Sequence, residues 1–510
     1  MLAVVLSYGL NGIDGYPVRV EVNLSGGLTQ FELVGLPDAA VKESRERVRT
    51  ALKNSGFAYP DGRVTINLAP ADQKKEGPAY DLPLAVGILA AGGRLNPDAL
   101  KSTAMLGELS LDGSVQSVRG VLPMVISALE GGRVDSILIP AANAGEVRCI
   151  SGINIYPVSS LKEAFEHLTG ERPIERLETA AYEKLLGERT PTVDFSFVKG
   201  QKSAKRALEI AAAGGHNVIM IGPPGSGKTL MARCMPTILP DMTFEEALET
   251  TRIHSAAGLM DGGTLLVERP FRTPHHTASS VSLIGGGAHA SPGEISKAHN
   301  GVLFLDELPE YRRDVLEALR QPMEDGFVTI TRVSAQSTYP SSFMLICSMN
   351  PCPCGNYGSR TQACRCSQAE IRRYLNRVSG PLLDRIDLHI EIESVPPERI
   401  SDDTLEESSA AVRARVEKAR AVQRERYRGR GISCNARLDA RSITEFCRMK
   451  PDAQKMLMKA CETMKLSNRA FPRILKVART IADMGESKVI QINHVAEAVQ
   501  YRMLDNKYWG

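Results

Sequence analysis

The chain has 510 residues, 43% hydrophobic and 24% charged, which is too long for one ordinary core and predicts two or three domains. No apolar run reaches the ~18–20 residues that cross a bilayer, and the N-terminus has no basic start typical of a signal peptide. We therefore expect a cytoplasmic protein without a membrane partner. The net charge of +3 by itself says nothing about a nucleic-acid partner. Ten cysteines in a chain of this size do not indicate a disulfide scaffold.

Periodicity divides the chain into four expected regions. Residues 1–170 alternate β-like runs (VRVEVNL, RVTINLA, DSILIPA) with helical stretches, which predicts an α/β domain. Residues 171–196 are charged, contain two prolines and are expected to be a linker. Over residues 197–395 the order helix, strand, glycine loop, helix, followed by the strand-like runs VLFLDE and FMLICSMN, predicts a mostly parallel sheet with crossover helices. Residues 396–510 are expected to be almost entirely helical.

The clearest functional motif is GPPGSGKT, which follows an apolar strand and precedes a helix. Glycines let backbone N–H groups cradle phosphates, and the helix N-terminus adds a partial positive charge. We expect Lys228 to reach the β- and γ-phosphates and the Thr229 hydroxyl to bind Mg²⁺. The residues predicted to bind ATP in this loop are Gly222, Pro223, Pro224, Gly225, Ser226, Gly227, Lys228 and Thr229.

Two later strands end in polar residues. The run GVLFLDE delivers Asp306 and Glu307 to the carboxyl edge of the predicted sheet, where ligands bind in such folds. Asp306 is expected to hold Mg²⁺ through water, and Glu307 to orient and deprotonate the attacking water. Asn350 follows another strand and is a candidate γ-phosphate sensor, although alone it would be typical of a turn before Pro351.

A cysteine cluster predicts a metal site. Cys352 and Cys354 form one C-x-C pair, and Cys364 and Cys366 form a second, ten residues further on. Four thiolates on a glycine-containing loop are able to close a tetrahedral zinc site, and the alternative is four reduced thiols. Six other cysteines are scattered and expected to be structural: Cys149, Cys234, Cys347, Cys434, Cys447 and Cys461.

Two basic clusters and a histidine pair leave alternatives open. Residues 411–430 hold eight basic residues against two acidic ones, a pattern that alone favours a solvated helix face. His275 and His276 are open between metal ligands, DNA contacts and packing residues, and the pattern favours packing. The second basic cluster, near the cysteines, consists of Arg360, Arg365, Arg372, Arg373 and Arg377.

Long motifs in a fixed order resemble the AAA+ ATPases, and within them the magnesium-chelatase-related ComM family, also called YifB. The motifs are GPPGSGKT, GVLFLDELPE, SMNPCPCG, SGPLLDRIDLHIEI and SNRAFPRILKVARTIADM. The resemblance implies a homo-hexameric ring with DNA-dependent ATPase and helicase activity. It also implies branch migration that helps to integrate incoming single-stranded DNA during natural transformation.

The resemblance also implies roles for particular residues. Arg385, in LLDRID, would be an arginine finger acting in the neighbouring subunit's site. The helical lid of these ATPases usually supplies a further sensor, for which Arg473 and Lys476 are alternatives on one helix face. For DNA we expect sequence-independent phosphate contacts from both basic clusters, in particular from Arg424 and its neighbours Arg426 and Arg428.

Residues 1–170 resemble the proteolytic domain of Lon-type proteases, a fold also found in RadA-type recombination proteins. Lon-like enzymes place a nucleophilic serine in a Gly-Pro-Ser-Ala-Gly turn, whereas residues 77–81 read GPAYD, with Ala79 in the place of the nucleophile. The partner lysine is also missing, because residues 121–124 read VLPM. Without nucleophile or base, covalent hydrolysis has no route, so the domain is expected to be a scaffold for ring assembly or DNA.

Together these patterns predict an α/β protein with a Lon-like N-terminal domain, an AAA+ core with a Cys-rich insertion at 352–366, and a C-terminal helical lid. The predicted function is an ATP-dependent hexameric motor on single-stranded and branched DNA that requires Mg²⁺ and zinc. The alternatives are a chelatase-like motor that acts on a partner protein and a protein-remodelling ATPase without translocation.

Overall fold

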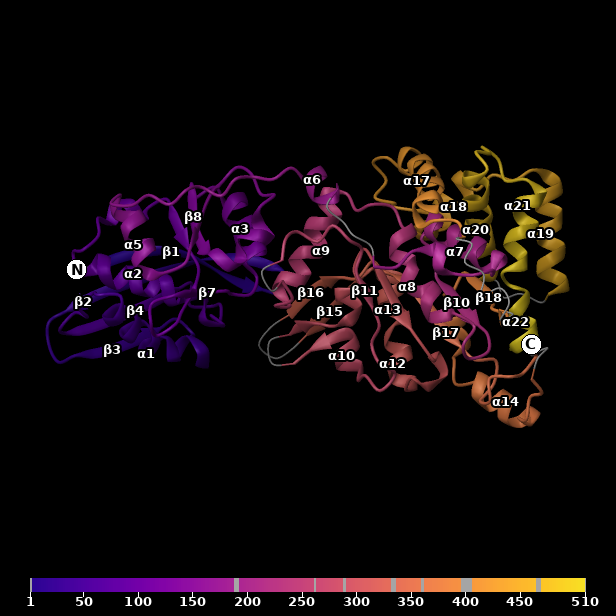
Figure 1. The fold of residues 1–510 in the computed structure, drawn as a ribbon, viewed down its shortest axis with the longest axis horizontal. Coiled ribbons are helices and arrows are strands. Elements are labelled where there is room, and N and C mark those ends of the chain that lie inside the picture. Colours follow the sequence, from indigo (N-terminus) through magenta and orange to yellow (C-terminus); the bar gives the residue numbers. More distant parts are fainter. Residues whose placement is uncertain are drawn as a thin grey trace.

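A computed structural model shows an elongated molecule, with the N-terminus at one end and the C-terminus near the other (Figure 1). Two main sheets and a group of C-terminal helices follow one another along its length. The structure describes residues 2–187, 192–260, 263–287, 290–331, 336–358, 362–395, 406–464 and 469–509.

The N-terminal sheet has seven strands in the order β3-β4-β2-β1-β5-β8-β9. The strands are β1 (Leu2–Asn11), β2 (Asp14–Ser25), β3 (Gln30–Val34), β4 (Arg63–Ala69), β5 (Thr103–Met105), β8 (Ser136–Pro140) and β9 (Asn154–Val158). Strand β2 pairs antiparallel with β1 and β4, whereas β1, β5, β8 and β9 run parallel. In β2 the alternate residues Val18, Val20 and Val22 are fully buried, which is the period of a strand with one face in the core.

Helices pack on this sheet. They are α1 (Ala39–Asn54), α2 (Asp81–Ala91), α3 (Val121–Gly131), α4 (Ala144–Val147) and α5 (Leu161–Thr169). Helix α2 is buried along its whole length between the sheet and α1. The three β-like runs expected in this region lie in β2, β4 and β8, so the α/β character predicted from periodicity is confirmed.

The second sheet has five parallel strands in the order β11-β14-β17-β10-β18. They are β10 (Val218–Ile221), β11 (Phe271–Arg272), β14 (Val302–Leu305), β17 (Met344–Met349) and β18 (Leu388–Glu391). Its helices include α7 (Lys202–Gly214), α8 (Lys228–Ile238), α9 (Phe244–Ala256), α10 (Ser280–Ile284), α12 (Arg313–Ala318) and α14 (Gln368–Leu375). Strand β10 comes first in the sequence yet lies between β17 and β18, so the strand order reverses beside it. In such sheets ligands bind outside the carboxyl ends of the strands at that point.

Beyond residue 405 the described residues form helices and no ladder strand. They are α17 (Ser409–Arg426), the short η6 (Asn435–Arg437), α18 (Ala440–Phe446), α19 (Pro451–Thr463), α20 (Ala470–Met484), α21 (Ile492–Gln500) and α22 (Met503–Tyr508). Helices α17 and α20 pack against α7, and their apolar faces share one continuous core with the second sheet. Among the described helices none combines the length and the apolarity needed to cross a bilayer.

Helix α9 joins the N-terminal part to the second sheet. Ala247 of this helix and Met242, two residues before the helix begins, belong to a buried apolar cluster that also includes residues of α3 and β8. Arg252 donates to Asp14 at 2.6 Å, and the Gly120 N–H at the start of α3 donates to the Ser255 carbonyl at 3.0 Å. The two parts therefore meet through both an apolar contact and polar bonds.

Candidate active site

The phosphate loop lies where the strand order of the second sheet reverses. Strand β10 ends at Ile221, the loop spans residues 222–227, and α8 begins at Lys228. Gly225 and Gly227 have φ angles of +76° and +89°, which L side chains rarely adopt, so the glycines of the motif are required by the backbone. The backbone of this loop and the first turn of α8 offer N–H groups and a partial positive charge of the kind that binds phosphates at helix N-termini.

Lys228 and Asn350 meet at this loop. The Lys228 ammonium donates to the carbonyls of Gly222 at 2.7 Å and Pro223 at 2.8 Å, and to Asn350 Oδ1 at 3.3 Å. Burial lowers the pKa of Lys228 to about 8, against the opposing effect of the nearby carboxylates Asp306 and Glu307. The structure thus brings the candidate sensor Asn350, which follows β17, to the lysine that the sequence predicts at the β- and γ-phosphates.

The predicted magnesium ligands are also in contact. The Thr229 hydroxyl donates to Asp306 Oδ2 at 3.0 Å, and the Ser348 hydroxyl near the end of β17 donates to Asp306 Oδ1. A hydroxyl and a carboxylate are oxygen ligands of the kind that Mg²⁺ takes beside nucleotide phosphates. Ser348 is fully buried and fixes the carboxylate from the sheet side, a role that sequence reasoning did not assign to it.

Glu307 is held in an unusual backbone conformation beside this pair. Its φ angle is +53°, in the left-handed region, which costs free energy and persists at functional sites where the surroundings impose it. Its N–H donates to Asp306 Oδ1 at 3.1 Å, while its carboxylate is exposed. A free carboxylate next to the phosphate loop is what a base for the attacking water requires.

His276 contacts that carboxylate, and sequence reasoning missed this by favouring a packing role. His276 Nδ1 lies 3.7 Å from Glu307 Oε2, and its ring faces Tyr311 edge-on at 6.4 Å between centroids. The Tyr311 hydroxyl donates to the Pro274 carbonyl and so fixes the loop that follows β11. A polar pair directly after an edge strand of this sheet was the available signal, since every strand of a parallel sheet ends at the same edge.

We expect His276→Ala to lower the rate of ATP hydrolysis roughly tenfold with little change in ATP affinity, because a misplaced base slows the step without removing phosphate contacts. Turnover and nucleotide binding measured on the same preparation check this. His275→Ala is the matched control, since His275 bonds Thr277 and not Glu307. Equal rates in the two variants would contradict a positioning role for His276.

The candidate arginine finger and the two candidate lid sensors lie together, at the opposite edge of the sheet. Arg385, Arg473 and Lys476 line one cavity of about 280 Å³ together with Asn217, which precedes β10, and Asp387, which precedes β18. Because the strands are parallel, this is the amino edge, whereas the phosphate loop follows the carboxyl end of β10. Within one chain these cations therefore do not reach the chain's own nucleotide site.

The three cations differ in their partners. Arg385 is ion-paired with Glu324 and donates to the Pro381 carbonyl at 2.7 Å. Arg473 is ion-paired with the buried Asp387 at 2.8 Å. Burial lowers the pKa of Lys476, whose ammonium donates to the Ala436 carbonyl at 3.0 Å. Both sensor candidates line the same cavity, so the geometry does not distinguish Arg473 from Lys476 as the sensor.

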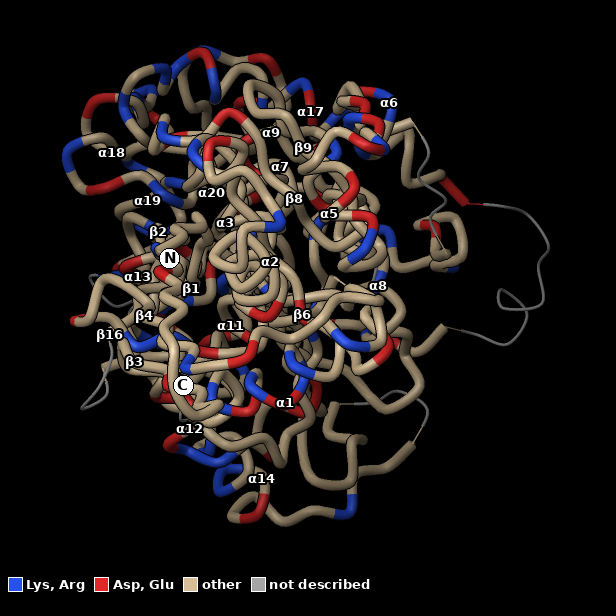
Figure 2. Tube along the Cα trace, turned by 90° about the vertical axis from the view of Figure 1, so that its left-hand side faces the viewer, with Lys and Arg blue, Asp and Glu red and all other residues tan. Residues whose placement is uncertain are grey.

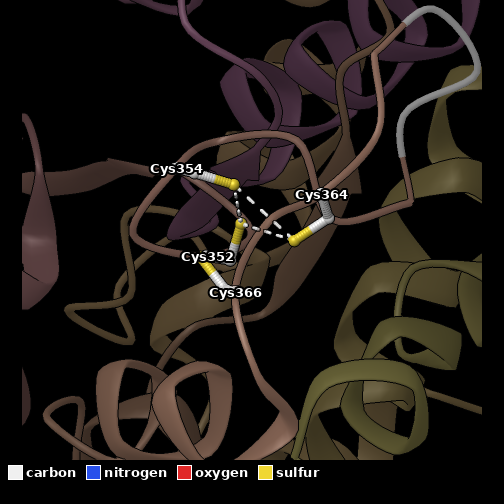
Figure 3. A group of neighbouring side chains, drawn as sticks. All are labelled: Cys352, Cys354, Cys364 and Cys366. Carbon is white, nitrogen blue, oxygen red and sulfur yellow. Dashed lines mark hydrogen bonds between the residues drawn. The ribbon is translucent and has the colours of Figure 1, made fainter.

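The four clustered cysteines converge on one point (Figure 3). Cys352 Sγ lies 3.4 Å from Cys354 Sγ and 3.7 Å from Cys364 Sγ, and the last two are 3.6 Å apart. All four sulfur atoms, including that of Cys366, lie within 4.8 Å of one another. Tetrahedral zinc with Zn–S bonds of about 2.3 Å places its sulfur ligands about 3.8 Å apart, so the cluster fits this metal.

The cysteine loop packs directly on the phosphate loop. It begins two residues after Asn350, and Gly355 within it has a φ angle of +80°. A Cβ atom on Gly355 would lie 2.5 Å from Cδ of Pro224, so a side chain at this position would displace the phosphate loop. The other scattered cysteines behave as expected: they are free, and all but the half-buried Cys461 are buried.

One cavity of the N-terminal part lies at the expected protease-like site. Ala79 and Met124 line one cavity of about 90 Å³, so the positions expected for nucleophile and base come together and carry neither group. Ser291, Pro292 and Tyr339 of the AAA+ part line the same cavity. A neighbouring lysine, Lys75, is fully buried and donates to backbone carbonyls of its own loop.

Most basic side chains of residues 411–430 form hydrogen bonds or ion pairs with other residues of the protein. Figure 2 shows Lys and Arg positions interspersed with Asp and Glu positions along the chain, the helical part included. Arg426, expected at DNA, donates to the buried Asp483 at 2.9 Å, and Arg428, in the turn that follows α17, is paired with Glu425 of that helix. Arg424 alone of these three makes no hydrogen bond or ion pair with any described residue. The DNA contact expected of Arg426 therefore stays a prediction, and in this structure its guanidinium is paired with Asp483 of the lid. Arg360 lies outside the described residues.

A five-stranded parallel sheet whose carboxyl edge carries a phosphate loop, a threonine-bonded carboxylate and a second carboxylate defines an ATPase of the AAA+ class. Three family models match the chain. They are "Magnesium chelatase, subunit ChlI" over residues 194–400, "Subunit ChlI of Mg-chelatase" over 20–143 and "Magnesium chelatase, subunit ChlI C-terminal" over 406–502.

Individual proteins narrow the class further. The chain is 44% identical to the competence protein ComM of Haemophilus influenzae strain Rd, over 99% of this chain and 98% of that protein. It is also 44% identical to the protein YifB of Escherichia coli strain K12, over 99% of this chain and 97% of that protein. The chain belongs to the ComM/YifB family of magnesium-chelatase-related AAA+ ATPases.

A third similarity concerns Lon proteases. The chain is 28% identical to Lon protease 2 of Bacillus subtilis over 186 residues, a third of each chain. Together with the parallel sheet and the C-terminal helices, this confirms the predicted fold class, an α/β protein that combines a Lon-like part, an AAA+ core and a helical lid.

Proposed function

We propose that this protein is a cytoplasmic homo-hexameric motor that hydrolyses ATP with Mg²⁺ to move single-stranded and branched DNA. Its task would be branch migration that helps to recombine incoming DNA during natural transformation. Lys228 would bind the phosphates, Thr229 and Asp306 the Mg²⁺, Glu307 would activate water, and Asn350 would sense the γ-phosphate. The domain division at residues 170, 196 and 395 is part of this proposal.

One observation supports the proposed ring of subunits. The Arg385 cavity and the phosphate loop lie at opposite edges of one sheet, so a site that contains both needs a second copy of the chain. A head-to-tail contact that brings one edge to the other is heterologous, and such a contact generates a ring when the rotation between copies closes. In that arrangement Arg385 supplies a positive charge to the neighbour's transition state, with Arg473 or Lys476 beside it.

The DNA part of the proposal draws on the family. One relative that matches the whole chain is named a competence protein, and competence concerns the uptake of DNA. The second candidate is a chelatase-like or protein-remodelling ATPase that acts on a partner protein. It is favoured by the three family models, all of which are described by magnesium chelatase.

DNA-dependent turnover separates the two candidates. ATP hydrolysis would be measured alone and with single-stranded, duplex and three-strand junction DNA, together with strand movement on a fluorescent junction. We expect junction and single-stranded DNA to stimulate hydrolysis and ATP to drive strand movement. Turnover that is indifferent to every DNA, with no strand movement, would support the protein-directed alternative.

We also propose that Cys352, Cys354, Cys364 and Cys366 hold one structural Zn²⁺. Backbone N–H groups, first that of Arg365 and then that of Asn356, lower the pKa of Cys354 to about 6, which favours the thiolate that binds metal. Four sulfur atoms this close would repel one another as thiolates without a cation between them. Because Gly355 of this loop packs on Pro224, the metal would also brace the phosphate loop.

Metal analysis of protein purified without added zinc should give about one equivalent per chain, since structural zinc binds tightly at neutral pH. Cys364→Ser should lose the zinc and weaken ATP binding. The matched control is Cys461→Ser, which replaces a half-buried cysteine outside the cluster and should keep both. Metal-free wild-type protein with four titratable thiols in the loop would refute the site.

A further inference from the structure

A second cavity at the amino edge of the AAA+ sheet has no role in the proposed site. It has a volume of about 180 Å³ and lies between the ends of α7 and α8, the starts of β14 and β17, and helix α17. A space needs only about 10–15 Å³ by this measure to hold one water molecule. The cavity is therefore large enough for a polyatomic ligand.

Three arginines line this cavity without a carboxylate partner among the described residues. Arg420 donates only to the carbonyls of Ala212 and Ser433. Arg437 donates to the Ser342 hydroxyl at 3.1 Å and to the carbonyls of Met323 and Phe343. Arg424 lines the cavity and makes no hydrogen bond or ion pair with any described residue.

The two acids that also line the cavity do not offset these charges, because each is bonded to another arginine. Glu246 accepts from Arg269 at 2.8 Å, and Asp241 accepts from Arg413 at 3.1 Å. The excess positive charge also affects Cys434, which lines the same cavity. Although its burial acts in the opposite direction, the charges of Arg420 and then Arg437 lower the pKa of its thiol.

We propose that this cavity binds a phosphate group through Arg420, Arg424 and Arg437. Planar guanidinium groups bind phosphate oxygens by paired, charge-assisted hydrogen bonds, and a partly enclosed site strengthens them. Three cations without acidic partners match a multiply charged anion better than a single carboxylate. The site would order Arg424, which is exposed at the C-terminal end of α17.

The position of the cavity suggests two sources for the phosphate. The two cavities are neighbours along the sheet edge, because Arg437, Gly215 and Phe343 line both this cavity and the one that contains Arg385. The phosphate would belong either to a nucleotide or to a nucleic-acid backbone. Binding itself goes beyond the proposed function, because it requires neither a ring nor movement on DNA.

Calorimetric titration of the full-length protein with inorganic pyrophosphate tests the site. The Lys228→Ala background removes the main contribution of the phosphate loop. In that background we expect Arg424→Gln to weaken pyrophosphate binding about tenfold, the effect of losing one charge-assisted contact. Lys418→Gln is the charge-matched control: it removes an exposed cation from another face of α17, lines a different cavity, and should leave binding unchanged.

Two outcomes would overturn the proposal: no pyrophosphate binding in the Lys228→Ala protein, or equal binding in the Arg424→Gln and Lys418→Gln variants. Because Arg424 makes no hydrogen bond or ion pair with any residue that the structure describes, its loss should not unfold the chain, which melting curves would check. Otherwise-wild-type Arg424→Gln then identifies the source. A nucleic-acid source predicts weaker oligonucleotide binding and a log–log salt slope reduced by about 0.7–0.9. A nucleotide source predicts a changed KM for ATP and unchanged DNA affinity.

Discussion

Glu307→Gln is expected to bind ATP as the wild type does and to hydrolyse it ~10²–10⁴-fold more slowly, the usual cost of losing a general base. The reason is geometric. The Thr229–Asp306 hydrogen bond does not involve the Glu307 carboxylate, so we expect Glu307 to add little to ground-state binding while its exposed carboxylate remains available to water. Lys228→Ala should instead abolish binding, because this ammonium lies within the phosphate loop itself.

Nucleotide affinity and single-turnover hydrolysis, measured side by side, distinguish the two defects. Glu310→Gln is the matched control: it neutralises a carboxylate three residues further on, which is paired with Arg377 at 2.9 Å, and should keep near-normal turnover. Normal turnover in Glu307→Gln would remove the catalytic assignment. Loss of binding in the same variant would mean that the carboxylate helps to hold Mg²⁺.

Arg385→Ala is expected to bind ATP but lose turnover by ~10³–10⁵-fold, the range observed for arginine fingers. Mixing it with Lys228→Ala should partly restore hydrolysis. An interface formed by the intact phosphate loop of one variant and the intact Arg385 of the other contains every group. This follows from the placement of the two groups at opposite edges of the sheet.

A second mixture gives the control for this experiment. Lys228→Ala and Glu307→Gln both damage the phosphate-loop side of a site, so no interface in their mixed rings is complete and activity should stay at the parental levels. Turnover of the Arg385→Ala mixture that never exceeds either parent would contradict action in trans. Arg385 would then be left with its ion pair to Glu324, a purely structural role.

The local motifs of the nucleotide site could be predicted because each depends on short-range backbone chemistry. GPPGSGKT needs its glycines for positive φ angles and its lysine at the start of a helix, and a motif of eight residues contains both features. The acidic pair after a buried strand follows the same logic. The cysteine spacing likewise predicted a cluster whose sulfur atoms the structure brings within 4.8 Å of one another.

What only the tertiary structure decided are the contacts between distant segments. The sequence treated His276 as packing, since nothing local links it to Glu307; the two meet because β11 and β14 are neighbours in one parallel sheet. It also treated residues 411–430 as one basic stretch. Asp483 on another helix neutralises Arg426, whereas Arg424, two positions earlier, is left facing a cavity.

The sequence by itself thus determined the class of protein, and it predicted the residues of the nucleotide site and the missing nucleophile and base of the Lon-like part, because these depend on which residue types stand at fixed short spacings. The tertiary structure decided which charges are available for ligands. A charge is free or neutralised according to what packs against it, and packing partners lie far apart in the chain. The tertiary structure likewise decided that Arg385 and Lys228 lie at opposite edges of the sheet, because the edges exist only once the strands have paired.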